Sequence, residues 1–275
     1  MIIGIDLGGT KIAAGIVRNG KIVKRVEIPT LSAEGKERVI AQMRLALNTL
    51  VPSGKGITAV GIGVPGIYAG TKVIDLPNIQ ALSGIDLKKA LKLRCPVVVE
   101  NDARCFALAE ANGVKNAIGV IMGTGLGTGI IIDGNAYRGQ GNAGELSRVI
   151  ADLHTGRGDW ESFFGGPKIL ARHHARGGKE RTCSEIWDAR TNAAQETKDE
   201  TIHHIAMHMA NLCNIFDPEL IVFGGGVSRP DLIAAARKAL PTYLPHAKRF
   251  PKVRVSAHGA DAGILGAAHV AHKRS

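Results

Sequence analysis

The feature that most constrains this fold is a strand, a glycine turn and a second strand within the first 17 residues. Residues 1–5 are apolar around one glycine and predict a buried strand, and Ile12–Val17 predict another. Between them, Gly8 and Gly9 allow the backbone to come close to a ligand. The chain therefore opens with a hairpin whose turn is suited to contact a bound group.

The side chains at this turn fit a phosphate group. Thr10, Lys11 and backbone N–H groups can donate hydrogen bonds to phosphate oxygens, and Asp6 can hold a metal ion beside them. A Walker loop would need Gly-x-x-x-x-Gly-Lys-Ser/Thr opening a helix, and the sequence contains no such match. The alternative at this point is an ordinary hairpin with a Gly-Gly turn.

The same device recurs in the middle of the chain. Residues 117–122 predict a strand, 123–129 a glycine turn and 130–133 another strand. The spaced glycines do not indicate a dinucleotide-binding turn, because an apolar strand follows where that turn requires a helix. We therefore expect two halves of similar construction with a cleft between them.

The remaining stretches alternate between strand and helix patterns. Asn101 or Asp102 is expected to cap a helix, and residues 177–182 are polar and predict a loop. Further strands are expected at 20–28, 57–64, 71–74, 95–100 and 220–223, and helices at 34–50, 87–93, 102–112, within 165–216 and at 261–273.

Composition excludes several classes of protein. The 275 residues suffice for two cores, and 45% hydrophobic with 21% charged residues is ordinary for a soluble globular chain. No apolar run reaches the roughly 18–20 residues needed to span a bilayer, and the start lacks the charged region of a secretory signal. Four scattered cysteines without a C-x-x-C pair favour a reducing, cytoplasmic location.

The net charge of +11 does not by itself indicate a nucleic-acid partner. The basic residues are dispersed, and neither a basic helix nor an RNA-binding motif is present. An anionic cosubstrate such as ATP accounts for part of the excess, because a basic surface attracts anions of every kind.

Six motifs occur in an order and spacing that together are specific. They are residues 6–11, 61–66, 100–102, 123–129, 217–226 and 261–268. With them the chain resembles the ROK family of bacterial sugar kinases and sugar-sensing repressors, within the actin/hexokinase-like superfamily, over nearly its whole length. The resemblance implies an α/β fold of two ribonuclease H-like domains with a sugar-and-ATP cleft between them. The sugar-side domain would comprise 1–114 with the helix 261–275, and the nucleotide-side domain 115–260.

The resemblance also implies roles for individual residues. Asp102 is the expected general base, and Asp6 the expected support of Mg²⁺. Residues expected at the sugar are Pro65, Gly66, Asn78, Asn101, Asp102, Glu145, Arg148 and Glu161. Residues expected at Mg-ATP are Asp6, Gly8, Gly9, Thr10, Lys11, Gly123, Thr124, Gly125, Gly127, Gly225 and Gly226.

These roles agree with the chemistry of phosphoryl transfer. A sugar hydroxyl must lose its proton as the phosphoryl group arrives, and a carboxylate within hydrogen-bond reach can take it. The alternatives are that Asp102 only caps a helix, and that Glu145 and Glu161 are solvated carboxylates.

Two stretches depart from the family pattern. Many members hold zinc with a His and a Cys-x-Cys-Gly-x-x-Gly-Cys run, whereas residues 155–160 contain no cysteine, so no structural zinc is expected. His154 is expected at the surface, and His204 with His208, four apart on a helix, lacks a third ligand in a recognisable motif.

The second departure concerns the sugar. Residues 144–148 are Gly-Glu-Leu-Ser-Arg where the family has Gly-Glu-x-Gly-His. An arginine is always charged and only donates, so Arg148 either contacts a hydroxyl, recognises an anionic or differently substituted sugar, or points away. This difference puts glucose in doubt more than sugar-kinase chemistry.

The expected function is ATP-dependent phosphorylation of a hexose or amino-hexose at its primary hydroxyl. Alternatives are a non-catalytic sugar-binding or regulatory member, a kinase for fructose or N-acetylmannosamine, and an activator ATPase or acyl-substrate kinase of the superfamily. A regulator would carry a winged helix-turn-helix before the hairpin, which starts here at residue 2. Expected partners are the sugar and Mg-ATP, without specific nucleic acid or membrane, and a second copy in a homodimer.

Overall fold

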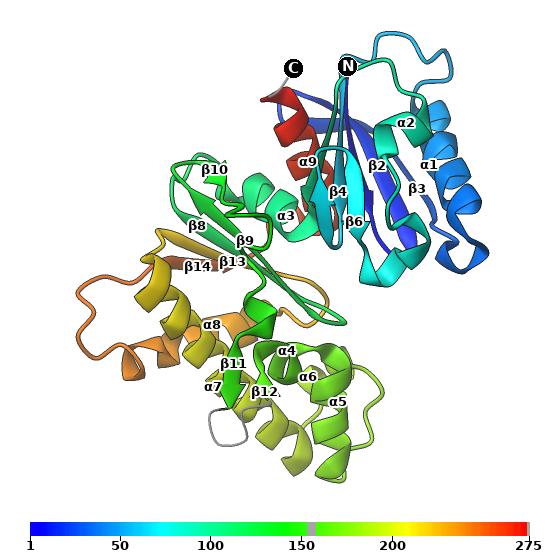
Figure 1. The fold of residues 1–275 in the computed structure, drawn as a ribbon. Coiled ribbons are helices and arrows are strands. Elements are labelled where there is room, and N and C mark those ends of the chain that lie inside the picture. Colours follow the sequence, from blue (N-terminus) through cyan, green and yellow to red (C-terminus); the bar gives the residue numbers. More distant parts are fainter. Residues whose placement is uncertain (153–157, 274–275) are drawn as a thin grey trace. The chain divides into compact units, whose positions relative to one another are not determined.

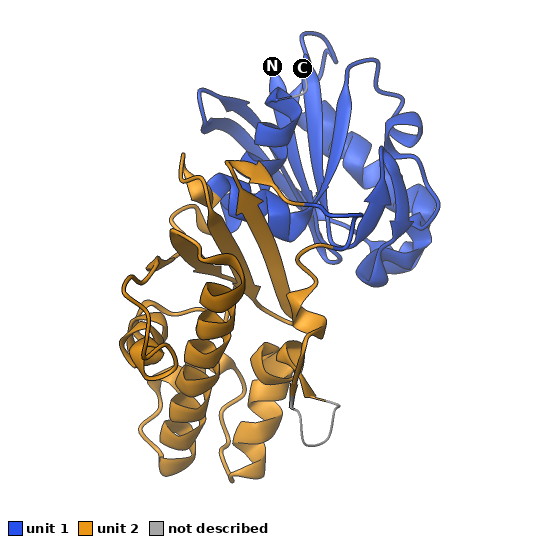
Figure 2. Ribbon diagram, turned by 60° about the vertical axis from the view of Figure 1, so that its left-hand side comes forward, with its two compact units in different colours: residues 1–109, 138–142, 260–275 blue, residues 110–137, 143–259 orange. Residues whose placement is uncertain are grey.

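A computed structural model describes residues 1–152 and 158–273 and divides the chain into two compact units (Figure 2). Unit 1 contains residues 1–109, 138–142 and the segment from 260 onward, and unit 2 contains 110–137 and 143–259. Each unit has one five-stranded sheet whose first two strands form a glycine hairpin. No helix of the described ranges is both long and apolar enough to cross a membrane.

The sheet of unit 1 has the order β3-β2-β1-β4-β7. Its first three strands are antiparallel neighbours, whereas β1, β4 and β7 run parallel (Figure 1). The strands are β1 (Ile2–Leu7), β2 (Lys11–Arg18), β3 (Lys21–Pro29), β4 (Ala59–Val64) and β7 (Val97–Asn101), with a separate pair of β5 (Ile67–Ala69) and β6 (Lys72–Asp75). The helices are α1 (Lys36–Leu50), α2 (Leu87–Leu91), α3 (Asp102–Ala111, whose last two residues belong to unit 2) and α9 (Ala262–His272). Short 3₁₀ turns are η1 (Ser32–Glu34), η2 (Pro77–Leu82) and η5 (Gly259–Asp261).

Helix α9, the last described element, packs directly on the first and fourth strands. The approach is close because the facing strand residues lack side chains. A Cβ at Gly4 would lie 2.0 Å from the carbonyl oxygen of Ile264, and one at Gly61 would lie 1.8 Å from that of Ala267. The two ends of the chain thus build one sheet-and-helix layer.

The sheet of unit 2 has the order β10-β9-β8-β13-β14. The pair β8 and β9 is antiparallel, and β8, β13 and β14 run parallel. The strands are β8 (Ala117–Met122), β9 (Leu126–Ile132), β10 (Asn135–Ala136), β13 (Leu220–Gly224) and β14 (Lys252–Val255), with a separate pair of β11 (Ile150–Asp152) and β12 (Gly158–Asp159). The helices are α4 (Trp160–Phe164), α5 (Gly166–Ala175), α6 (Cys183–Asp188), α7 (Asn192–Phe216) and α8 (Pro230–Ala239), with 3₁₀ turns η3 (Leu146–Arg148) and η4 (Leu240–Thr242).

The second glycine turn is shorter than expected. We predicted a turn over 123–129, but only Gly123–Gly125 form it, and β9 begins at Leu126. Gly127 and Gly129 lie inside that strand, paired with Ile121 and Gly119 of β8. The reason is that β8 and β9 form six residue pairs, the last between Met122 and Leu126, so that only residues 123–125 remain for the turn. The Gly123 N–H closes this turn by donating to the Gly125 carbonyl (2.9 Å). Gly127 is therefore a strand residue.

His208 of α7 lies in the core of unit 2. Its ring lies 4.8 Å from the ring of Trp160 and 5.4 Å from that of Phe164. Among the described residues, neither of its ring nitrogens has a hydrogen-bond partner. Burial lowers the pKa of His208 from 6.5 to about 4. His204, four residues earlier, packs its ring on Phe163, so both side chains face the aromatic residues of α4.

We predict that unit 2 loses stability in mild acid because of His208. The unfolded chain takes up a proton near pH 6.5 and the folded one only near pH 4, so the free energy of unfolding falls over this window by about 3 kcal/mol. Urea unfolding of wild type and His208→Phe at several pH values measures this loss. His246 is exposed, so His246→Gln is the control, and its free energy of unfolding should change with pH as that of the wild type does. If the free energy of unfolding of His208→Phe fell with pH as steeply as that of the wild type, His208 would not be the cause of the loss.

Candidate active site

The predicted catalytic side chains of unit 1 lie at the carboxyl ends of three neighbouring parallel strands. Asp6 of β1 is in register with Gly63 of β4, which is in register with Glu100 of β7. Asn101 ends β7 and Asp102 begins α3. Two strand spacings, about 10 Å, separate β1 from β7. Ligands of parallel α/β sheets bind at the carboxyl ends of the strands, which is where these side chains lie.

Asn101 and Asp102 start helix α3 together. The Asn101 side chain accepts a hydrogen bond from the Arg104 N–H (3.2 Å), and Asp102 Oδ1 accepts one from the Ala103 N–H (2.8 Å). The predicted capping is therefore confirmed for Asn101. Asp102 stays partly exposed, and Gly63 of β4 packs close to its backbone, since a Cβ there would lie 3.7 Å from the Asp102 Cα. The carboxylate thus has a fixed backbone and access to a ligand.

Asp6 is held close to the start of α9. A Cβ at Gly263 would lie 2.5 Å from the Asp6 carboxylate, which explains the glycine of the late Asp-Ala-Gly motif. Burial raises the pKa of Asp6 to about 6, against the opposing effect of Lys11. Lys11 itself is exposed and pairs with Glu27 at 3.3 Å.

Two hydroxyl side chains that the sequence analysis missed hold the first glycine turn. Thr30 Oγ1 donates to the carbonyl of Gly8 (2.6 Å), and Ser32 Oγ donates to that of Gly9 (2.9 Å). Because both carbonyl groups are occupied, the peptide planes of the turn are fixed. Nothing in the local pattern distinguishes Thr30 and Ser32 from other hydroxyl residues, so the sequence carried no signal for them.

One of the predicted sugar residues of unit 1, Asn78, lies beside this turn. A Cβ at Gly9 would lie 3.1 Å from the Cβ of Asn78, whose side chain is exposed on η2. Gly66, after Pro65, packs on β6, since a Cβ there would lie 2.3 Å from the carbonyl oxygen of Asp75. Thr10 is exposed at the turn.

In unit 2, Glu161 lies against the second glycine turn. Its Oε2 accepts a hydrogen bond from the Leu126 N–H (3.2 Å), and a Cβ at Gly125 would lie 2.6 Å from that oxygen. Arg148 lies 3.9 Å from Glu161 and forms an ion pair with it. Glu145 is exposed at the start of η3. A residue predicted at the sugar therefore lies directly beside a residue predicted at the nucleotide.

Short helix α4, which carries Glu161, is fixed at both ends. Asp159 accepts hydrogen bonds from the N–H (2.9 Å) and the hydroxyl (2.6 Å) of Ser162, and the hydroxyl bond is the main reason that the pKa of Asp159 is lowered. Arg172 donates to the carbonyl groups of Ser162 (2.9 Å) and Phe163 (2.8 Å). These positioning residues were missed, although Asp-x-x-Ser before an apolar run is a helix-start pattern.

The backbone around the second turn is also anchored. The N–H of Gly166 donates to the Gly123 carbonyl (2.8 Å), and the N–H of Val227 to the Met122 carbonyl (3.0 Å). Gly225 has φ +87° and packs on Met122, whereas a Cβ at Gly226 or Gly123 would meet no atom of the described residues within 4 Å. Thr124 lies between Gly123 and Gly125 in the turn.

The comparisons with known proteins identify the family of the chain. The model of the ROK family matches residues 2–274. The chain belongs to the ROK family. N-acetyl-D-glucosamine kinases of Haemophilus influenzae and Aliivibrio fischeri are 29% and 32% identical to it, each over 98% of both chains.

Solved structures of ROK proteins have the same fold over nearly the full length. A ROK family glucokinase from Streptomyces griseus, in complex with glucose and AMPPNP, matches with a TM-score of 0.82 and 28% identity over 99% of both chains. A ROK hexokinase from Thermus thermophilus matches with 0.86 and 29%, over 99% of this chain and 98% of that one. The chain is thus a sugar kinase with the actin/hexokinase-like fold.

In unit 2, the backbone at Gly123 and Gly226 could hold phosphate groups of Mg-ATP. At Gly123 and Gly226 the described residues leave space where a side chain would stand, so a ligand can approach the backbone. The Asp6 carboxylate is the kind of oxygen ligand that Mg²⁺ prefers, so Asp6 could hold the metal. Within 1–152 and 158–273, no three His, Cys, Asp or Glu side chains gather as a metal site. The zinc-motif stretch 155–160 falls partly, and His154 wholly, outside the described residues.

We predict that Gly123→Ala raises the KM for ATP by roughly 10- to 100-fold, the loss of about one hydrogen bond to a charged group. Gly123 is a cleaner probe than Gly9 or Gly125, because a side chain there displaces no neighbour, whereas the others would push Asn78 or Glu161. Steady-state kinetics at saturating sugar measures the effect. Gly134, outside the site, has equal space for a side chain, but its φ is positive and an alanine there would be strained. The control is therefore Asn135→Ala, at the neighbouring residue. An unchanged KM would contradict phosphate binding at this turn.

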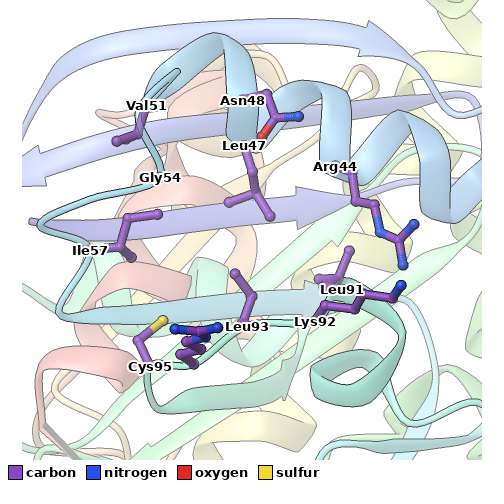
Figure 3. Close-up of a pocket in the computed structure, with 11 residues that line it drawn as sticks. Arg44, Leu47, Asn48, Val51, Gly54, Ile57, Leu91, Lys92, Leu93 and Cys95 are labelled. Atoms are coloured by element: carbon purple, nitrogen blue, oxygen red, sulfur yellow. The ribbon is translucent and has the colours of Figure 1, made fainter.

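A separate cavity of about 460 Å³ lies between α1 and the connection from α2 to β7 (Figure 3). Leu47, Leu91 and Leu93 contribute apolar surface, and Arg44 and Lys92 are cationic. None of the predicted site residues lines it, so this cavity does not belong to the candidate active site.

Proposed function

We propose that this sugar kinase transfers the γ-phosphoryl group of Mg-ATP to the primary hydroxyl of N-acetylglucosamine, with Asp102 as the general base. The observation that carries the proposal is the carboxyl end of the parallel strands in unit 1, where Asp6 lies near the end of β1, Asn101 ends β7 and Asp102 begins α3. N-acetylglucosamine is favoured among sugars because relatives of this name align over 98% of the chain.

Each protein residue has a definite task in this reaction. Asn78 and Asn101 carry amide groups that both donate and accept, as binding of sugar hydroxyls requires. Asp102 accepts the proton of the attacking hydroxyl. Mg²⁺, when bound with ATP near Asp6, neutralises charge on the phosphates. The backbone of the two glycine turns binds and orients the phosphate oxygens, with the first turn held by Thr30 and Ser32.

A coupled ADP-release assay over a panel of sugars tests the proposal. The panel contains N-acetylglucosamine, N-acetylmannosamine, glucosamine, glucose, mannose and fructose. Each is tested with ATP, where ADP release is followed, and with polyphosphate, which yields no ADP, so that the sugar phosphate formed is measured instead. We expect the highest kcat/KM for N-acetylglucosamine with ATP. A higher value for another sugar, or for polyphosphate, would contradict the corresponding part of the proposal.

Glucose is the second candidate substrate, since the glucokinase that matches over 99% of both chains was solved with glucose. Arg148 argues for a different sugar, because it stands where the family has histidine. Its guanidinium is exposed and 3.9 Å from Glu161. It can therefore donate to the same ligand as Glu161.

We predict that Arg148→Ala lowers kcat/KM for the preferred sugar by roughly 10- to 100-fold, the scale of one charge-assisted hydrogen bond. The double variant Ser147→Gly/Arg148→His, which restores the family pattern, should shift the ratio of kcat/KM values toward glucose. The sugar panel measures that ratio in both proteins. An unchanged ratio would mean that Arg148 has no part in sugar selection.

A further inference from the structure

A buried carboxylate directly precedes the Asn101–Asp102 pair and takes no part in the mechanism above. The Glu100 side chain is 0% exposed. Its Oε1 accepts hydrogen bonds from the Tyr68 hydroxyl (2.6 Å), the Asn101 N–H (2.9 Å) and Arg104 Nε (2.8 Å). Its Oε2 accepts two from Arg138, at 2.7 Å from Nε and 2.5 Å from the terminal nitrogen. Between them, the two carboxylate oxygens thus bind residues from four parts of unit 1.

Two of these bonds act on the catalytic segment itself. The carboxylate fixes the peptide of Asn101, and through Arg104 it fixes the first turn of α3. The Arg104 N–H in turn donates to the Asn101 side chain (3.2 Å), so Glu100, Asn101 and Arg104 form a closed ring of contacts. The backbone that carries Asp102 runs through this ring.

The remaining bonds hold residues 138–142, the short segment of unit 1 that lies between two stretches of unit 2. Arg138 contacts one oxygen of Glu100 through two of its nitrogens, and Arg104 donates to the carbonyl of Gly141 at 3.3 Å. The segment leads within three residues to Glu145. One carboxylate therefore anchors both the backbone of the base and a backbone that leads to a predicted sugar residue.

We propose that Glu100 is a positioning residue of this kinase, which with Arg104 and Arg138 sets the orientation of Asp102 for proton transfer. The inference rests on the proposed role of Asp102. A buried ion pair adds little stability compared with apolar residues of the same size, because burying the charges costs as much as their attraction returns. Orientation of the neighbouring pair gives this network a function that an apolar cluster would not supply.

A second network at the other end of α3 supplies a matched control. Glu110 is also 0% exposed and pairs with Arg254 at 2.6 Å, and it accepts further bonds from Ser256, Ala257 and His258. The arginine partners are equally exposed, 37% for Arg138 and 36% for Arg254. Glu110 is not among the site residues. Glu100→Gln and Glu110→Gln therefore remove the same charge from similar surroundings.

The experiment compares Glu100→Gln, Glu110→Gln, Arg138→Ala, Arg138→Lys and Tyr68→Phe on the best sugar of the panel. Three quantities are measured for each: kcat, the Kd of the sugar by calorimetry, and the free energy of unfolding in urea. We expect Glu100→Gln and Arg138→Ala to lower kcat by roughly 10- to 100-fold, as a misplaced catalytic group does, with the sugar Kd changed less than about threefold. Arg138→Lys keeps the positive charge but lacks the several N–H donors of a guanidinium, so its kcat should lie between those of Arg138→Ala and the wild type.

Glu110→Gln should lose a similar free energy of unfolding while its kcat stays within about twofold, and Tyr68→Phe, which removes one of the bonds to Glu100, should lower kcat less than Glu100→Gln does. If kcat falls equally in Glu100→Gln and Glu110→Gln, or in neither, the positioning role is wrong. Arg138→Ala decides the question if Glu100→Gln does not fold, since Arg138 is partly exposed. A normal kcat in Asp102→Asn would instead refute the proposed base, whatever Glu100 does.

Discussion

Asp102→Asn should lower kcat by roughly 10²- to 10⁴-fold while the sugar still binds. The asparagine keeps the size and can still hydrogen-bond the attacking hydroxyl, but it cannot take up the proton as the phosphoryl group arrives. The backbone is expected to stay in place, because Asn101, and not Asp102, caps α3 through the Arg104 N–H. Stopped assays for kcat and calorimetry for the sugar Kd separate the two effects.

Asp86→Asn is the matched control for this loss. Asp86 precedes α2 in the same unit and accepts a hydrogen bond from the Lys89 N–H at 3.1 Å, so it is also an aspartate at a helix start. Its replacement should leave kcat unchanged. Full turnover by Asp102→Asn, or an equal loss in Asp86→Asn, would remove Asp102 from the role of base.

Gly61→Ala should lower the free energy of unfolding by about 3 kcal/mol or more, the upper range for forcing extra atoms into a packed core. The added Cβ would lie 1.8 Å from the carbonyl oxygen of Ala267, which is backbone and cannot move without the whole of α9. Urea unfolding followed by circular dichroism measures the change.

Gly123→Ala makes the same substitution where a Cβ meets no atom of the described residues within 4 Å, and its unfolding should be close to wild type. The comparison separates the cost of contact with α9 from the general effect of replacing glycine. A stable Gly61→Ala variant would mean that α9 does not pack on β4 as closely as described.

Much of the fold could be predicted because it depends on local patterns. The hairpin of residues 2–17 and the buried strands β4, β7 and β13 have apolar runs bounded by glycine, proline or polar residues. The length of the second turn could not be predicted in this way. Glycine is a residue type that favours turns, so the sequence placed Gly127 and Gly129 in one. Only their pairing with Ile121 and Gly119 across the β8–β9 ladder shows that they belong to a strand.

The same distinction applies to the candidate site. Asn101 and Asp102 were predictable because they follow a buried strand at a helix start. Thr30, Ser32 and Arg172 were not, because each acts on a carbonyl group distant in sequence. The ion pair between Arg148 and Glu161 was not predicted for a related reason: only the fold around α4 brings these two residues together.

The packing of α9 on β1 and β4 has a consequence for the order of events on the ribosome. Unit 1 begins with the first strand but needs α9 to cover Gly4 and Gly61, while unit 2 ends at residue 259. Synthesis of α9 follows that of β4 by roughly 200 residues, or about 10–40 s at ordinary translation rates. Of the two units described, the one whose first strand is translated earlier is thus completed later, and truncation before α9 would leave the sheet of unit 1 without the helix that covers Gly4 and Gly61.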